Sequence, residues 1–246
     1  MAKLSNEEII NKSEDIRNQL ELSLDLPIDI FAECLKIKNI TIVERPLSEN
    51  ISGICIKGNS SSCIIEINST MSYGRKRFTL AHELYHYYFS KEAFIVCNKS
   101  FVDVSDEESN ANHFASYFLM PKFALRKFIK EKCDDKIELT SILAMENYFQ
   151  VSRKTLLIRL KSDKRISEEE MVPFTVNIII NAKKNGYSDK LYVPEEGEKK
   201  TTLGEYIRLC EALLDKDLIS KAKYEELLLD AGRADIVFGE EKENYE

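Results

Sequence analysis

The pentapeptide His82-Glu83-Leu84-Tyr85-His86 is the most informative stretch of this sequence. If it lies on an α-helix, residues four apart are separated by only about 40° around the axis, so both histidines face the same side. Two imidazoles one turn apart can bind one tetrahedral Zn²⁺, and the glutamate between them can act as a general base on a water molecule in that site. Apolar and aromatic residues flank the motif, which indicates a helix that is at least half buried. The pentapeptide therefore predicts a metal site with His82 and His86 as ligands and Glu83 as the catalytic residue.

A third metal ligand is expected from the helix predicted over Ser105 to Met120. The candidates are Glu107, Glu108 and His113. On a helical projection both glutamates lie close to the apolar stripe that faces the core, whereas His113 lies on the opposite side and is expected to face water. Ser105 and Glu108 also have the S-x-x-E spacing of a capping box, which needs no metal. Helical geometry alone leaves the choice between the two glutamates open.

The first half of the chain predicts an α+β domain. Ser5 and Glu8 have capping-box spacing at the start of a helix that is expected to reach about Leu22, and Pro27 suits the first turn of a second, short helix. Three short segments rich in β-branched residues follow, and then comes the helix with the metal motif. The predicted strands are Ile40–Val43, Ile51–Ile56 and Cys63–Ile67. This order is typical of an α+β fold, because helices and strands do not alternate as they do in α/β proteins.

Composition narrows the function classes. The 8 glycines form no G-x-G or G-K-S/T pattern, which excludes the usual phosphate-binding loops. The 6 cysteines form no C-x-x-C pair, so we expect reduced, mostly buried thiols rather than a zinc knuckle or a redox site. No apolar run approaches the roughly 20 residues of a bilayer span, and no apolar export signal is visible at the start. These observations predict a cytoplasmic protein without membrane contact.

A helix-turn-helix-like module is predicted over residues 136–165. Two short helices, about Ser141–Phe149 and Ser152–Leu160, flank a turn, and the second is expected to project Arg153, Lys154 and Arg159 outward. Although the formal net charge of the chain is -7, residues 122–165 alone carry +6, as a surface for nucleic acid or an acidic partner would. Two capped amphipathic helices also form an ordinary structural corner or a docking surface for a substrate, and these alternatives stay open.

The motif helix reads R-K-R-F-T-L-A-H-E-L-Y-H at residues 75–86, and a second helix reads E-S-N-A-N-H-F-A-S-Y-F-L-M-P at residues 108–121. Together they resemble the ImmA/IrrE family of intracellular zinc peptidases. The resemblance implies that Glu108 is the third zinc ligand and that Asn112, one turn further on, orients one of the ligand histidines. Two positions depart from the family pattern. Tyr85 replaces a glycine, which would alter how the helix packs on the sheet, and Asn110 replaces a glutamate that is not a ligand.

The resemblance implies a compact peptidase domain and a function, and the residue patterns predict the organisation of the rest of the chain. The expected layout is a compact zincin-like metallopeptidase domain over residues 1–135, the helix-turn-helix-like module over 136–165, and a helical C-terminal region over 166–246 with helices at about Leu203–Leu214 and Ser220–Ala231. The implied function is a zinc-dependent endopeptidase that cleaves a helix-turn-helix transcriptional repressor, often encoded by an adjacent gene, in response to stress or mobile-element signals. The alternative is a non-proteolytic regulator that binds DNA or a repressor, like a toxin–antitoxin partner, with a structural zinc.

Overall fold

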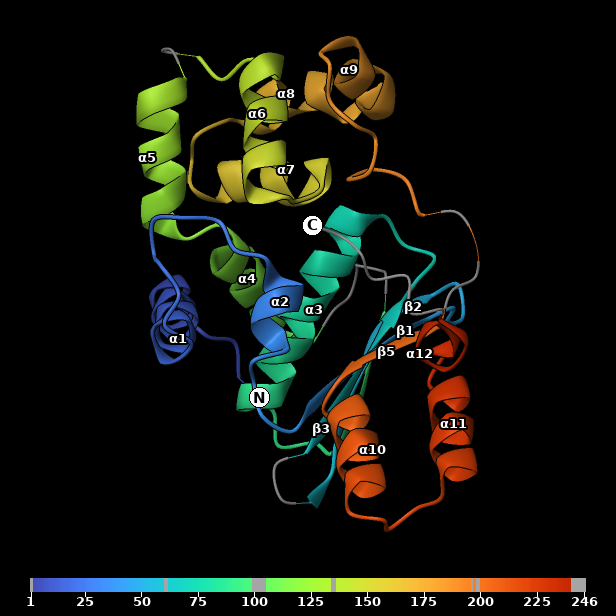
Figure 1. The fold of residues 1–246 in the computed structure, drawn as a ribbon. Helices are drawn as coiled ribbons and strands as arrows, with labels where there is room; N and C mark the ends of the chain where they lie inside the picture. Colours follow the sequence, from blue (N-terminus) through green and yellow to red (C-terminus); the bar gives the residue numbers. More distant parts are fainter. Residues whose placement is uncertain are drawn as a thin grey trace.

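The computed structural model describes residues 2–59, 62–98, 105–133, 136–195, 197 and 200–239, and a five-stranded sheet lies at its centre (Figure 1). The three predicted strands are present, each one or two residues longer than expected: β1 (Ile40–Arg45), β2 (Ile51–Lys57) and β3 (Cys63–Asn68). Two short strands that the sequence pattern does not predict, β4 (Phe94–Asn98) and β5 (Thr201–Gly204), complete the order β4-β2-β3-β1-β5. β1 and β3 are parallel, and the other neighbouring strands are antiparallel.

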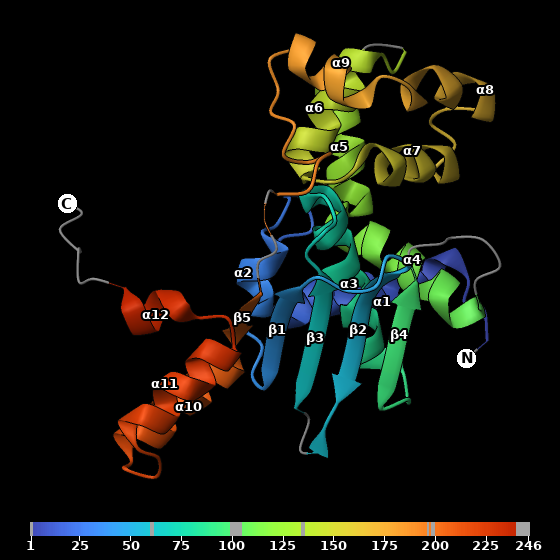
Figure 2. The same ribbon diagram turned by 90° about the vertical axis from the view of Figure 1, so that its right-hand side faces the viewer.

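One face of this sheet is covered by helices from the first half of the chain (Figure 2). They are α1 (Asn6–Gln19), α2 (Ile30–Cys34), α3 (Tyr73–Phe89) and α4 (Asp106–Leu119). α1 begins with the predicted capping box of Ser5 and Glu8. α2 begins later than predicted, because the Asp29 side chain caps it, and Pro27 therefore lies outside the helix. α3 packs against β2, β3 and α4, so its middle turns are buried.

The C-terminal region contributes a strand as well as helices. β5 pairs antiparallel with β1, with Gly204 opposite Thr41. The helix predicted from Leu203 therefore starts two residues later, as α10 (Glu205–Asp215), because Leu203 and Gly204 belong to the strand and Gly204 turns the chain with a φ of 91°. α11 (Lys221–Asp230) and α12 (Ala234–Phe238) follow beside the β5 edge of the sheet (Figure 2). Backbone hydrogen bonds thus tie the C-terminal region to the sheet of the N-terminal half.

A second group of helices lies beyond one end of the sheet (Figure 1). It contains α5 (Lys122–Lys132), α6 (Leu139–Phe149), α7 (Arg153–Ser162), α8 (Glu168–Met171), a 3₁₀ helix at Val172–Thr175, and α9 (Ile178–Lys184). The predicted helix pair is present as α6 and α7. Gln150 ends α6 in the left-handed region and Ser152 caps α7. The domain boundary predicted at residue 135 falls outside the described residues. Within the described ranges, every helix falls short of the length or apolar character that a bilayer crossing requires.

Candidate metal centre

α3 brings the residues of the predicted motif to one buried place. His82, Glu83 and His86 are 6%, 0% and 1% exposed, because the sheet covers the helix on one side and α4 covers it on another. The Nε2 atoms of the two histidines lie 3.1 Å apart, as expected for imidazoles one helical turn apart that point the same way. The helix thus presents two nitrogen donors to one point, with the glutamate carboxylate beside them.

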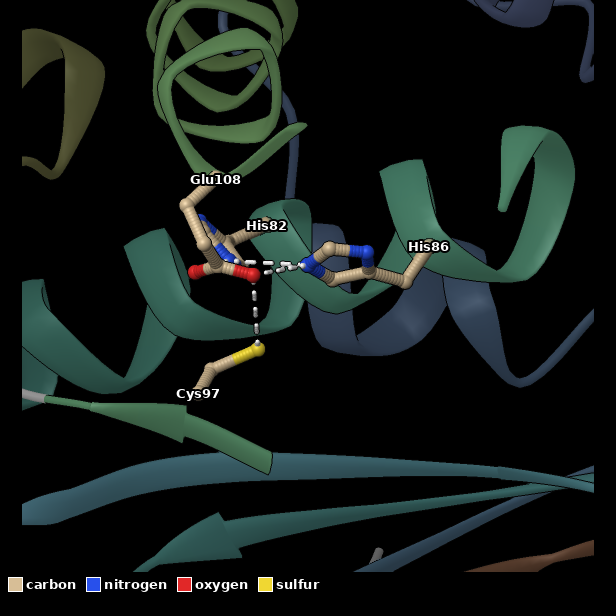
Figure 3. A group of neighbouring side chains, drawn as sticks. All are labelled: His82, His86, Cys97 and Glu108. Carbon is tan, nitrogen blue, oxygen red and sulfur yellow. Dashed lines mark hydrogen bonds and ion pairs between the residues drawn. The ribbon is translucent and has the colours of Figure 1, made fainter. Parts of the chain in front are cut away.

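The third donor comes from α4. Glu108 Oε2 lies 3.2 Å from His82 Nε2, and Glu108 Oε1 lies 3.1 Å from His86 Nε2 (Figure 3). Ser105 accepts a hydrogen bond from the Glu108 N–H, but the Glu108 carboxylate contacts the histidines, so only half of the alternative capping box forms. Glu107 lies on the far side of the second ring, 3.9 Å from His86 Nδ1. The tertiary structure therefore separates the two glutamates that helical geometry left equivalent.

Hydrogen bonds on the outer ring nitrogens orient both histidines. Asn112 Oδ1 lies 3.0 Å from His82 Nδ1, and Ser90 Oγ lies 2.9 Å from His86 Nδ1. Ser90 in turn donates a hydrogen bond to the Glu107 carboxylate. An Nδ1–H that donates to an oxygen leaves the Nε2 lone pair free to bind a metal. Asn112 therefore lies where the resemblance implied, and Ser90 with Glu107 plays the same part for His86, which the sequence pattern does not reveal.

The charges in this cluster shift the pKa values of its members. Burial raises the pKa of Glu83. Burial works against a charged His82, but its hydrogen bond with Glu108 and the charges of both glutamates outweigh burial and raise its pKa. Burial also works against an ionised Glu108, yet its hydrogen bonds with the two histidines hold its pKa well below the usual range. A buried carboxylate is stabilised by an adjacent positive charge, and a divalent cation can supply that charge.

A fourth potential donor, Cys97, comes from β4. Its Sγ lies 3.5 Å from Glu83 Oε2 and 3.9 Å from Glu108 Oε1, and the residue is 1% exposed. Burial and the negative charges of Glu83 and Glu108 raise the pKa of the thiol. One donor atom from each of His82, His86, Cys97 and Glu108 lies within 4.8 Å of the other three. The sequence carries no signal for Cys97, because its strand is short and its spacing to other cysteines is not that of a metal motif.

The donor set fits a zinc-type cation, since histidine nitrogen, cysteine sulfur and carboxylate oxygen are the ligands of zinc in proteins. Glu83 Oε1 is buried and has no hydrogen-bond partner among the described residues. A buried carboxylate oxygen normally has a partner, so we expect a further polar group, such as a water, to bind next to Glu83 Oε1. A pocket of about 20 Å³ adjoins His82, Glu108 and Asn112, which is room for about one water molecule. Gly53 of β2 permits this close packing, because a Cβ there would lie 2.5 Å from Glu83 Oε1.

A larger cavity of about 490 Å³ opens beside this pocket. The two share Arg75, Phe78 and Asn112, and the larger one extends between α3 and α4 on one side and α7 and α9 on the other. His113 lines this cavity and is partly buried, so it is less exposed than expected. Burial lowers the pKa of His113. His113 does not belong to the donor cluster that the described residues form.

The two positions that depart from the motifs pack around α4. Tyr85 is fully buried, and its ring centroid lies 5.7 Å from that of Phe114 on α4. The larger side chain therefore fills the contact between the two helices that carry the donors, rather than only altering the contact with the sheet. Asn110 accepts a hydrogen bond from the Leu4 N–H and donates one to the Ala2 carbonyl, both at 3.0 Å. Asn110 thus fastens the N-terminal segment to α4.

The expected outward direction of two basic residues on α7 is wrong. Arg153 is 2% exposed, and its guanidinium pairs with the Glu146 carboxylate on α6. Arg159 is also 2% exposed, and its Nε lies 2.9 Å from Asp163 Oδ2. A helical projection places charged residues on the surface, but a buried guanidinium is stable where a carboxylate pairs with it. Lys154 is exposed and lines the larger cavity. Contact of this helix with nucleic acid or a partner stays a prediction.

The family model described as the IrrE N-terminal-like domain (Peptidase_M78) matches residues 35–161, just over half of the chain. The matched range contains β1 to β4, the helices α3 and α4, and the α6–α7 pair apart from Ser162. A comparison with curated proteins gives no match. All four donors of the candidate metal centre, and Glu83 beside them, lie within the matched range.

Proposed function

The chain belongs to the family of IrrE N-terminal-like peptidases, and we propose that it is a zinc-dependent endopeptidase that cleaves a helix-turn-helix transcriptional repressor. The observation that carries the proposal is the convergence of His82, His86 and Glu108 beside the buried Glu83 carboxylate. The repressor as substrate, its origin from an adjacent gene, and stress or mobile-element signals as the trigger rest on the sequence resemblance. Zinc as the metal rests on the chemistry of the donors.

The side chains have distinct parts in the proposed reaction. His82, His86 and Glu108 would hold the cation, which when bound supplies positive charge that lowers the pKa of a nearby water and polarises the scissile carbonyl. Glu83 takes the proton from the attacking water and delivers it to the leaving amine. Burial raises the pKa of Glu83, which brings the carboxyl closer to the neutral range in which a general base works best. The hydrogen bond that His82 Nδ1–H donates to Asn112 Oδ1 keeps His82 Nε2 aimed into the site.

We expect the substrate chain to lie in the cavity of about 490 Å³ beside the metal pocket. The two spaces share Phe78, Arg75 and Asn112 in their walls, and Ile158 of α7 gives the larger one an apolar wall. Burial and the positive charge of Arg75 lower the pKa of Lys154, which also lines the cavity. We therefore expect an apolar side chain of the substrate to lie against Ile158 in this cavity.

Co-expression of the chain with the helix-turn-helix protein of an adjacent gene tests this function. Wild-type protein is expected to cut that protein into defined fragments. Glu83→Gln keeps the size of the side chain but cannot accept the proton, so cleavage should be about 10²- to 10⁴-fold slower. The metal content of both purified proteins should be the same, because Glu83 is not expected to be a ligand.

A matched control separates the role of Glu83 from a general effect of removing a carboxylate. Glu92 is exposed and lies outside the donor cluster, so Glu92→Gln is expected to cleave at the wild-type rate. The mechanism is wrong if metal-loaded Glu83→Gln protein cleaves as fast as wild type. Absence of cleavage of any adjacent helix-turn-helix protein, by metal-loaded wild type and by metal-loaded Cys97→Ser protein alike, would refute the proposed substrate.

A second candidate function is a non-proteolytic regulator that binds DNA or a repressor and uses zinc only for structure. The observation in its favour is the fourth donor, Cys97, because structural zinc sites have four protein ligands and catalytic sites usually three. The burial of Arg153 and Arg159 in ion pairs weighs against a nucleic-acid surface on α7. Salt-sensitive DNA binding that persists in Glu83→Gln protein would favour this function, and no DNA binding at low salt would oppose it.

A further inference from the structure

We propose that Cys97 is a fourth protein ligand of the metal and that its sulfur takes the place of the attacking water, so that the resting peptidase is latent. The proposal rests on the proposed function, in which Glu83 activates that water. In this proposal Cys97 inhibits the peptidase by occupying the water position, and it takes no part in peptide hydrolysis.

The position of the thiol is the first argument. A water that Glu83 can deprotonate must lie within hydrogen-bond reach of its carboxylate and close to the metal donors. Cys97 Sγ lies in that region, because the thiol donates a hydrogen bond to Glu83 Oε2 at 3.5 Å and also contacts Glu108 Oε1 at 3.9 Å. Figure 3 shows Glu108 reaching in from α4 and Cys97 reaching in from β4 on the opposite side. A water and this sulfur therefore compete for one position.

The donor count is the second argument. His82, His86 and Glu108 alone form a three-ligand set, which leaves one position of a tetrahedral zinc open. The sulfur brings the number of mutually close donors to four, which closes the site. When the metal binds, the Cys97 S–H bond breaks, its proton passes to the Glu83 carboxylate, and a sulfur–metal bond forms. Thiolate is also a ligand type that favours zinc over harder cations such as Mg²⁺ and Ca²⁺.

The sheet, rather than a flexible loop, holds the thiol in place. Cys97 pairs with Gly53 of β2, and its carbonyl accepts a hydrogen bond from Ser52 Oγ at 3.1 Å. Its neighbours on β4, Phe94 and Val96, are 60% and 40% exposed, so the strand turns only its alternate residues toward the helices. β4 is an edge strand, and within the described residues β2 is its one strand neighbour. A shift of β4 would withdraw the sulfur without breaking the centre of the sheet.

Cobalt substitution tests the ligation without any need for a substrate. A thiolate bound to Co²⁺ gives a strong charge-transfer absorption in the near ultraviolet, whereas nitrogen and oxygen donors do not. We expect this band in the Co²⁺-loaded wild type and its loss in Cys97→Ala and in Cys97→Ser. Cys210→Ala should keep the band, because Cys210 lies on α10 and outside the donor cluster. Chelator competition should show a Zn²⁺ Kd that rises about tenfold or more in both Cys97 variants, as for loss of a group that supports a metal site.

Repressor cleavage at saturating Zn²⁺ tests the latency. If the sulfur-free form is at most about 10% of the resting protein, removal of the sulfur should raise the cleavage rate about tenfold or more. No cobalt band in wild type would overturn the proposal whatever the activity, and it would leave the proposed function standing. A band in wild type with unchanged cleavage in Cys97→Ser would overturn the latency. Cys97→Ser nearly preserves the volume of the thiol, so it covers the case in which Cys97→Ala does not fold.

Discussion

Asn112→Ala is the most direct test of how the structure prepares the metal centre. Asn112 Oδ1 lies 3.0 Å from His82 Nδ1, and this contact fixes the ring orientation that aims Nε2 at Glu108. Alanine removes the acceptor and leaves His82, which is only 6% exposed, with an unpaired nitrogen. The ring can then rotate, and the tautomer with the proton on Nε2 becomes accessible. We therefore expect weaker metal binding with no change in the number of ligands.

The size of this effect follows from burial. Loss of a hydrogen bond to a buried polar group costs about 1–3 kcal/mol, which corresponds to about 5- to 150-fold in Kd. Loss of an outer partner of a ligand histidine typically costs about 10- to 100-fold in metal affinity, in agreement with this range. Because the adjoining pocket has a volume of about 20 Å³, one water can replace part of the contact, so the upper limit is not expected.

Zn²⁺ affinity measured by competition with a chromogenic chelator checks this prediction. His113→Gln is the matched control, because His113 is the next residue on α4 and lies outside the donor cluster, so its Kd should equal that of wild type. Asn112→Asp keeps an oxygen acceptor and should retain wild-type affinity or exceed it. If Asn112→Ala bound Zn²⁺ as tightly as His113→Gln does, the hydrogen bond would have no part in positioning His82.

Three further predictions concern the surroundings of the metal centre. Glu146→Leu removes the carboxylate that pairs with the buried Arg153 and should lower the free energy of unfolding by about 3–5 kcal/mol in urea titrations. Glu146→Leu combined with Arg153→Met should restore most of this free energy. A loss below about 1 kcal/mol in the single variant would contradict the buried pair. Ile158→Trp fills part of the larger cavity and should lower kcat/KM about tenfold or more at unchanged metal content. The control Ile64→Trp, on the exposed face of the sheet, should leave kcat/KM unchanged. Equal kcat/KM values in the two variants would mean that the substrate binds elsewhere. Burial lowers the pKa of His113 below 6.5, so the unfolded chain binds the proton more readily than the folded protein does. The free energy of unfolding therefore decreases as pH falls through 6.5, and the decrease levels off below the pKa of the folded state. His113→Gln should lose less stability than wild type between about pH 7.5 and about pH 5.

Local features of this protein could be predicted from the sequence because they depend on residues within one or two turns of each other. The spacing of His82 and His86 places both rings on one face of α3, whatever the rest of the chain does. The capping box of Ser5 and Glu8 forms for the same reason. The three longer strands are also recognisable, since their β-branched runs are bounded by turn residues.

Contacts between distant parts of the chain could not be predicted in the same way. β5 pairs with β1 across about 160 residues of sequence, and its four residues are too few to show an alternating pattern. Arg153 and Arg159 lie on a helix that a projection would turn toward water. Arg153 is instead buried beside Glu146 of α6, and Arg159 packs on Ser116 and Tyr117 of α4 and pairs with Asp163. Burial of a charge is decided by what packs over it, and no local pattern contains that information.

The metal centre combines a local feature that the sequence predicts with long-range contacts that it does not predict. Two imidazoles and a glutamate share one helix because their spacing matches 3.6 residues per turn, and this spacing can be read from the chain before it folds. The choice of Glu108, which the resemblance implied, has its physical basis only in the packing of α4 against α3, which points one carboxylate at both Nε2 atoms and the other at the back of His86. The position of Cys97 depends on the tertiary structure alone. Pairing with β2 sets the register of β4, and this register places the thiol next to the Glu83 carboxylate, where Glu83 would otherwise activate a water.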